Sequence, residues 1–300
     1  MLIAVKPPEE SRLSATSRLF SPGLIRELAL KGSSPQFSRL AKESCLLDQM
    51  HRESPLSSLF EKAFSLLQRK EFRNEYIYKN ALAHKILLGK HSLQTAAMLT
   101  EFRVGSCKAD IAILNGTSTV YEIKSERDSL VRIQDQVSWY GRFFAHVNVI
   151  TGENHIKNVF EAVPDDVGVL LLTDRFQIST IRKSQYSPER ISQDVIFNAI
   201  RRDEAKKILK NNGVELPKLP NTLMHTSLRK KFLELTPQLA HDGMVEVLGN
   251  ARSQSAITDI MKSIPQSLQA VVLSTSLRKT DYSRFLDVMN IPIIEALKWA

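Results

Sequence analysis

The sequence has little cysteine, and its cysteines lack the spacing of a zinc site. The 300 residues include only two, Cys45 and Cys107, which do not form a C-x-x-C arrangement. Disulfide-stapled secreted scaffolds and zinc folds need several cysteines at short spacings, so both classes are excluded. Two isolated thiols indicate a reducing, cytoplasmic setting.

Long apolar runs are also missing. A helix that spans a bilayer needs about 18 to 20 consecutive apolar residues, and no stretch of the chain approaches that length. The start of the chain, MLIAVKPPEESRL, has a short apolar run that lysine, prolines and acids soon interrupt. We therefore expect neither export nor membrane attachment. No Walker A motif is present, which excludes a P-loop motor within this chain.

Glycine and proline number eleven and twelve, and neither repeats nor low-complexity runs occur. Disordered, collagen-like and repeat architectures are therefore excluded. A length of 300 residues predicts roughly two domains at about 150 residues each. The net charge of +9 and the pI near 9.5 favour a polyanionic partner, because lysines and arginines that neutralise phosphates release condensed counterions. Nucleic acid is the leading candidate, although many proteins are mildly basic without binding it.

The order of local patterns predicts three successive regions. Residues 1–68 read as helices between Ser-Pro starts and glycine stops. Residues 69–186 begin with helical periodicity and then show strand signals, with one helix over 129–145 and another over 155–163. Residues 187–300 read as a helical domain. The middle region is thus expected to be α/β, with a mixed sheet that opens as an antiparallel meander and continues through a crossover helix.

The second and third expected strands, over 110–116 and 117–125, carry charges where a structural hairpin would be apolar. Alternation along a strand puts Glu122 and Lys124 on one face. A three-residue loop, Asn115 to Thr117, pairs Leu114 with Ser118 and places Asp110 opposite Glu122, with Cβ atoms roughly 4.5 to 5.5 Å apart. A two-residue loop would separate the two acids onto opposite faces. We predict the three-residue loop.

Two carboxylates at that distance repel each other unless a proton or a cation lies between them. Oxygen ligands from Asp110, Glu122 and the carbonyl group of Ile123 suit octahedral Mg²⁺, or Mn²⁺. With Lys124 beside the ion, the chemistry that uses such a set is phosphodiester hydrolysis. The ion polarises the phosphate and acidifies a water, while the amine orients the nucleophile or stabilises charge at phosphorus.

These residues resemble the PD-(D/E)xK nuclease superfamily, whose fold is the restriction-endonuclease-like core. Asp110 matches the family aspartate and Glu122-Ile123-Lys124 the triplet, although Ala109 stands where the family pattern has proline. The helix segment QVSWY is similar to the Q-x-x-x-Y motif of RecB-like branches. The arrangement looks most like an uncharacterised bacterial branch, which leaves the substrate open.

The resemblance implies further roles. Gln136 and Tyr140 would support the active site, and Glu75 would be an additional metal ligand from the first helix. The resemblance also implies a deoxyribonuclease that depends on Mg²⁺ or Mn²⁺. Family members suggest defence against foreign DNA or DNA repair, with DNA favoured over RNA. Basic residues that we expect to contact nucleic acid lie after the triplet and in a C-terminal helix; they are Arg127, Arg132, Arg201, Arg202, Lys206 and Lys207.

Simpler interpretations exist for each of these residues. Asp110 could end a strand, and Glu122 with Lys124 could form a solvated ladder on an edge strand. Tyr140 could be a core residue with a wet hydroxyl, and an acid at position 75 is favoured by the helix dipole alone. The basic residues could pair with neighbouring acids or form the solvated side of a helix.

Two other functions therefore stay open. The same fold could bind nucleic acid without hydrolysis. The helical regions could instead form an interaction module for a protein partner or for a second copy of the chain, with the α/β part as a scaffold.

Overall fold

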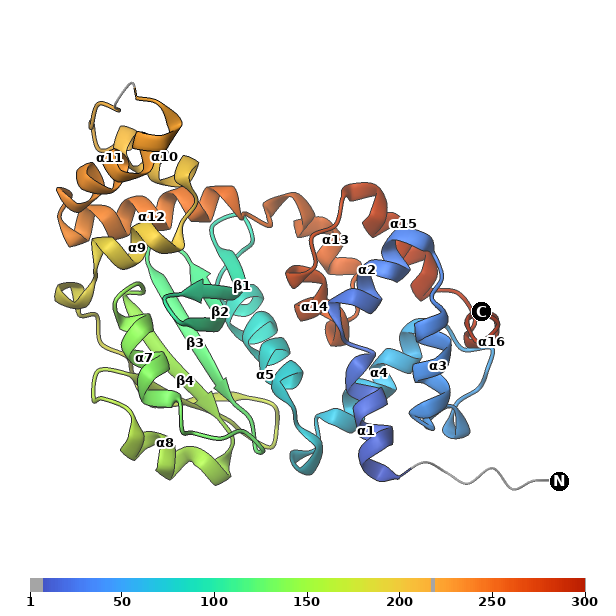
Figure 1. Ribbon diagram of the computed structural model, residues 1–300. Helices are drawn as coiled ribbons and strands as arrows, with labels where there is room; N and C mark the ends of the chain where they lie inside the picture. The colour runs from blue at the N-terminus through green and yellow to red at the C-terminus, as the bar shows by residue number, and fades with distance from the viewer. Residues whose placement is uncertain (1–7, 217–218, 300) are drawn as a thin grey trace. The chain divides into compact units, whose positions relative to one another are not determined.

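The computed structural model of the protein describes residues 8–216 and 219–299. Residues 1–7, which contain the short apolar start noted above, lie outside the described residues. The chain divides into two compact units (Figure 1). The helical unit comprises the described residues up to Ile86 together with those from Ala256 onward, and the sheet unit comprises Leu87–Ser255.

These units differ from the three successive regions that the sequence suggested. The expected C-terminal domain, 187–300, is split: its first part packs with the sheet, and the part after Ser255 joins the N-terminal helices. Hydrogen bonds join the two ends of the helical unit, from the Leu56 amide to the Ile291 carbonyl (2.8 Å) and from the Ile293 amide to the Ser54 carbonyl (2.9 Å). Contacts between segments so far apart leave no local pattern in a sequence.

Two helices of the helical unit, α2 and α3, begin at the Ser-Pro signals of the sequence. The Ser21 and Ser34 hydroxyls cap α2 and α3, and Gly32 ends α2 in the left-handed conformation that glycine adopts without strain. None of the described helices combines the length and apolarity needed to cross a bilayer. The helices of this unit are α1 (Glu9–Arg18), α2 (Pro22–Lys31), α3 (Pro35–Glu43), α4 (Leu56–Leu67), α5 (Glu75–Leu82), α13 (Thr258–Ser263), α14 (Gln269–Ser274), α15 (Lys279–Met289) and α16 (Ile293–Ala296).

The sheet unit contains a six-stranded mixed sheet whose strands lie in sequence order. The first three strands form an antiparallel meander, β3 to β5 run parallel, and β6 returns antiparallel. This confirms the α/β prediction, including the meander and the crossover helix between β3 and β4. The strands are β1 (Ala97–Val104), β2 (Cys107–Leu114), β3 (Ser118–Lys124), β4 (His146–Thr151), β5 (Gly168–Leu172) and β6 (Ile178–Arg182).

One hydrophobic core joins the sheet to its covering helices. Ile133, Val137 and Tyr140 of α7 pack with Val120 of β3 and Val149 of β4, as the helical periodicity of the segment predicts. The last four helices of the unit contribute to the same core and lie near the start of β3 (Figure 1). The helices of this unit are α6 (Leu88–Lys90), α7 (Ile133–Gly141), α8 (Ile156–Ala162), α9 (Gln193–Ala199), α10 (Arg202–Asn211), α11 (Asn221–Leu233) and α12 (Pro237–Ala251).

Two short loops fix the register of the meander. Leu114 pairs with Ser118, and the Asn115 amide donates to the Thr117 carbonyl (2.9 Å), which confirms the three-residue loop. The preceding turn has two residues, because Val104 pairs with Cys107. In an antiparallel hairpin the loop length fixes which residue pairs with which along both strands. These two loops therefore decide which side chains face each other across the meander.

His241 joins α12 to the start of β3 through a buried hydroxyl. The Ser118 hydroxyl oxygen accepts from the Ala145 amide (2.9 Å), so its own hydrogen points at His241 Nε2 (2.8 Å). The Nδ1–H of the same ring then donates to the Asp242 carboxylate (3.1 Å). Burial lowers the pKa of His241 despite that carboxylate. Burial, and then the charge of His241, lowers the pKa of His146.

Acidification should therefore destabilise the sheet unit. The unfolded histidines bind protons near pH 6.5 whereas the folded ones do not, so the free energy of unfolding falls as the pH drops through about 6.5. Each histidine contributes at most about 1.4 kcal/mol per pH unit. Urea midpoints at pH 5, 6 and 7.5 measure this slope. His241→Gln should flatten it, while His225→Gln, an exposed position on α11, should not; equal slopes in all three proteins would contradict the assignment.

Candidate active site

The third strand carries two charged side chains into the interior. Glu122 is 2% exposed and Lys124 7% exposed, and β3 lies between β2 and β4. The interpretation of these residues as a solvated ladder on an edge strand is therefore wrong. Charges are almost never this buried unless they are paired, so the pairing of these two side chains defines the site.

Glu122 is held at both carboxylate oxygens. Lys124 Nζ lies 3.0 Å from Oε1 of Glu122 and 2.9 Å from Oε1 of Gln136. The Gln136 amide nitrogen donates to that same Glu122 oxygen. The Tyr140 hydroxyl donates to the other oxygen, Oε2, at 2.8 Å, and lies 3.0 Å from the Lys108 carbonyl. Gln136 and Tyr140 reach Glu122 together because residues four apart share a helix face.

Burial in the site shifts the pKa values of Glu122 and Tyr140. Burial raises the pKa of Glu122, and the charge and hydrogen bond of Lys124 oppose this rise. Burial also raises the pKa of Tyr140, as do the charges of Glu122 and, to a lesser degree, Asp110. The Tyr140 phenol therefore stays protonated and donates to Glu122. The Tyr140 hydroxyl is buried and bonded to Glu122. Tyr140 is therefore not a core residue whose hydroxyl is exposed to water.

Asp110 lies in the middle of β2 rather than at a strand end. In the observed register, the pair that follows Ile111 with Tyr121 is Asp110 with Glu122. The Asp110 carboxylate accepts from the Ile123 amide at 2.8 Å. In a strand the amide and the carbonyl of one residue face the same neighbour, so the Ile123 carbonyl also faces the β2 side. Two carboxylates and a carbonyl are hard oxygen donors of the kind that Mg²⁺ and Mn²⁺ prefer.

A second acid, Glu101 of β1, lies beside Asp110 and was not expected from the sequence. Carboxylate oxygens of the two residues lie within 4.8 Å of each other. Glu101 also pairs with Lys108 at 2.5 Å, and its φ of 55° is unusual for a residue other than glycine. Such strained residues are common at functional sites. The sequence could have indicated Glu101 through the two-residue turn at Gly105-Ser106. This turn sets the register that puts Glu101 opposite Asp110.

Glu75 belongs to the other unit. It is the first residue of α5 in the helical unit, where its carboxylate pairs with Lys79 at 2.5 Å. This position at a helix start is the one that the helix dipole favours for an acid. Its role as a metal ligand stays a prediction.

The basic residues expected to bind nucleic acid fall into two groups. Arg127 and Arg132 are exposed just after β3, beside the strand end that carries Lys124. Arg201, Arg202 and Lys207 are exposed on α10 and at its start, and Lys206 is half-buried and pairs with Asp203 at 3.6 Å. The helices around α10 contact the sheet at Ser118, about 20 Å along β3 from Lys124 at about 3.3 Å per residue. The two groups therefore lie at opposite ends of the strand.

Comparisons with known proteins find one family model and one curated relative. A family model described as Bacteriophage P4 protein cII matches residues 68–278. Protein cII of Enterobacteria phage P4 is 30% identical over 135 residues, which cover 43% of this chain and 50% of that protein. The chain thus spans about half the length of that curated relative. No solved structure matches the chain.

Proposed function

The chain belongs to the family of the bacteriophage P4 protein cII, and we propose that its sheet unit is a metal-dependent nuclease that hydrolyses DNA phosphodiester bonds. One observation carries the proposal: a buried carboxylate, Glu122, bonded at once by Lys124, Gln136 and Tyr140. Replacing a buried ion pair by apolar residues is often neutral or stabilising. A fold that needed only a stable sheet would have little reason to keep these charges.

The order of elements supports a finer proposal for the fold. The meander β1 to β3 presents Asp110 and the Glu122-Ile123-Lys124 triplet, α7 crosses over with Gln136 and Tyr140, and β4 continues in parallel. This order is the one that the resemblance to the PD-(D/E)xK superfamily implies. We therefore propose that the sheet and α7 form a restriction-endonuclease-like core. Arg127 and Arg132, which follow the C-terminal end of β3, would contact phosphates of the nucleic acid.

The oxygen donors suit a divalent cation. Asp110, Glu122 and the Ile123 carbonyl would hold Mg²⁺ or Mn²⁺. Burial raises the pKa of Glu122, and a cation beside its carboxylate would favour the charged form. When bound, the ion supplies positive charge to the scissile phosphate and acidifies an attacking water. The chain provides the rest. The Lys124 ammonium stabilises charge that develops at phosphorus, Gln136 fixes that ammonium, and Tyr140 fixes Oε2 of Glu122.

Asp110→Asn tests the proposal directly. It keeps the size of the side chain and removes one anionic ligand, so cleavage should fall by about 100-fold or more. Plasmid, duplex, single-stranded DNA and RNA substrates are incubated with Mg²⁺ or with EDTA. Asp203→Asn, a surface acid on α10, is the matched control and should cleave like the wild type.

Three outcomes separate the candidate functions. Cleavage that needs Mg²⁺ and is lost in Asp110→Asn supports the nuclease. Binding of DNA without cleavage by either protein supports a binding platform on the same fold. If the wild type neither cleaves nor binds any of these substrates, the site has another function and the nuclease proposal fails.

A further inference from the structure

A cavity in the helical unit gathers positive charge. It has a volume of about 270 Å³ and lies between α1, α4 and the segment that follows α3. Lys62, Ser65, Leu66 and Arg69 line one wall with spacings of three, four and seven residues, which place them on one side of α4 and its continuation. Arg12 of α1, Cys45 and Phe72 also line the cavity.

The three cations of this cavity lack partners among the described residues. Arg12, Lys62 and Arg69 make no side-chain hydrogen bond or ion pair there, and Arg12 Nε is buried without an acceptor. A buried donor without a partner costs about 1 to 3 kcal/mol. The one acid that lines the cavity, Glu9, is exposed and leaves two net positive charges. Like charges that face one cavity repel each other, and an anion between them offsets both costs.

We propose that this cavity binds a phosphate group. A guanidinium offers N–H donors in a planar fork that matches a phosphate, and the ammonium of Lys62 adds a point charge. The volume lies just below the roughly 300 to 1,000 Å³ of sites for drug-sized ligands. It therefore suits a phosphate with at most a small attached group. The phosphate belongs either to a small phosphate ester or to the backbone of a nucleic acid strand.

Cys45 is a built-in reporter for this site. Its thiol is half-buried at the cavity, whereas the other cysteine, Cys107, is 2% exposed. A ligand in the cavity covers Cys45 and slows its alkylation by iodoacetamide. At a ligand concentration ten times its Kd, the rate should fall by about tenfold, in proportion to the free protein.

The experiment measures this rate with EDTA present, so that it does not depend on the proposed nuclease. The probes are inorganic phosphate, adenosine monophosphate and a short single-stranded oligonucleotide, each against potassium chloride of equal ionic strength. Protection by the two small probes identifies a small phosphate ester as the source, and protection by the oligonucleotide alone identifies the backbone. Either result supports the site.

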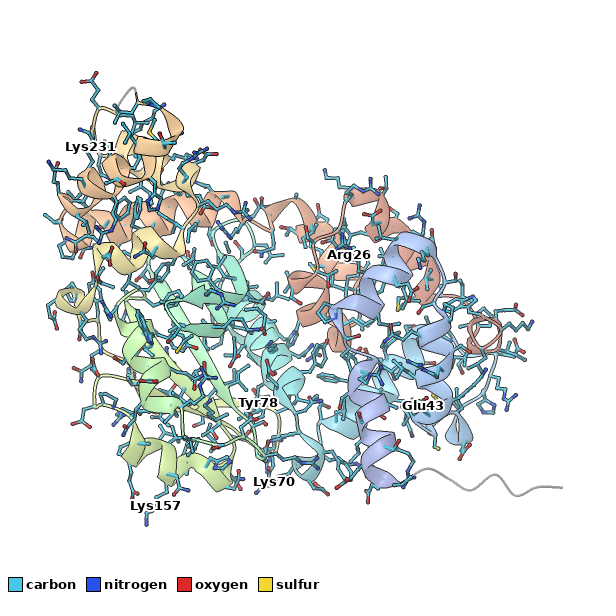
Figure 2. All side chains as sticks on the ribbon, in the orientation of Figure 1. Arg26, Glu43, Lys70, Tyr78, Lys157 and Lys231 are labelled. Atoms are coloured by element: carbon cyan, nitrogen blue, oxygen red, sulfur yellow. The ribbon has the colours of Figure 1, made fainter. Side chains whose placement is uncertain are left out.

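Arg12→Gln should weaken protection by about tenfold or more, the loss of one charge-assisted hydrogen bond. Lys62→Gln, an exposed position on α4, tests the same cavity without removing a buried group. Arg26→Gln is the matched control, because Arg26 is exposed on α2 outside the cavity (Figure 2). No protection by any probe, or equal protection in Arg12→Gln, Lys62→Gln and Arg26→Gln, overturns the proposal.

Discussion

Lys124→Ala should reduce Mg²⁺-dependent cleavage by about 1,000-fold or more, a loss of about 4 kcal/mol of transition-state stabilisation. Two losses combine in this variant. The amine that faces the phosphate disappears, and Glu122 loses the cation that opposes the rise of its pKa. A carboxyl group that is 2% exposed and has no cation beside it tends to take up a proton, and a protonated carboxyl group is a poor metal ligand.

The same substitution should lower the free energy of unfolding, because removal of one partner of a buried pair costs about 3 to 5 kcal/mol. Cleavage is therefore measured well below the thermal midpoint, with circular dichroism to confirm folding. Lys124→Arg separates the two losses. It keeps a positive charge beside Glu122 and should recover most of the stability, but its planar group does not replace the amine in position or shape. Its cleavage should stay at least about 100-fold below that of the wild type.

Lys157→Ala is the matched control for both variants. Lys157 is exposed on α8 and points away from the sheet unit (Figure 2), with its amine 4.0 Å from Glu161. Exposed pairs of this kind contribute about 0 to 1 kcal/mol, so stability and cleavage should both be close to those of the wild type. Cleavage by Lys124→Ala at the rate of Lys157→Ala would remove Lys124 from the mechanism.

The hairpin could be predicted because its information is local. Side chains alternate between the two faces of a strand, so the loop length alone decides whether Asp110 faces Glu122, and the predicted three-residue loop gives the observed pair of Leu114 with Ser118. The resemblance to the nuclease superfamily implied that Gln136 and Tyr140 support the active site, and both side chains bond Glu122, since helical spacing puts them on one face. Glu101 was not expected although its register is equally local, because its place opposite Asp110 depends on the first turn of the meander and the predicted pair of Asp110 with Glu122 depends on the second.

The division of the chain could not be predicted from local patterns. The segment after Ser255 reads as more C-terminal helix, and nothing in its periodicity shows that α15 packs on α2 of the helical unit. Such packing depends on the shapes of surfaces that are distant in the sequence. The same limit applies to Glu75, whose helical position was predicted but whose unit was not. Local sequence therefore predicts the side chains around Glu122 better than any ligand that another unit would supply.

Gly105→Ala should strongly lower the free energy of unfolding, because Gly105 lies directly against the Trp139 ring of α7. Gly105 has a φ of 56°, and a Cβ atom there would lie 2.2 Å from Cε3 of Trp139. The Arg142 guanidinium also lies over this indole ring, with its Cζ 4.9 Å from the ring centroid. Overpacking costs about 1 to 3 kcal/mol and a left-handed backbone a further 1 to 2 kcal/mol. We expect a loss of about 2 to 5 kcal/mol in the free energy of unfolding.

Gly116→Ala separates the cost of the steric clash with Trp139 from the cost of a left-handed backbone in a residue other than glycine. Gly116 has a φ of 65° in the other turn of the meander, and no atom lies within 4 Å of a Cβ there, so only the backbone cost of about 1 to 2 kcal/mol applies. The difference between the urea midpoints of the two variants measures the contact with Trp139. Since Trp139 lies between Gln136 and Tyr140 on α7, a displaced ring should also loosen both bonds to Glu122. Gly105→Ala should therefore lose cleavage that Gly116→Ala keeps, and equal midpoints would show that Trp139 does not hold the helix against this turn.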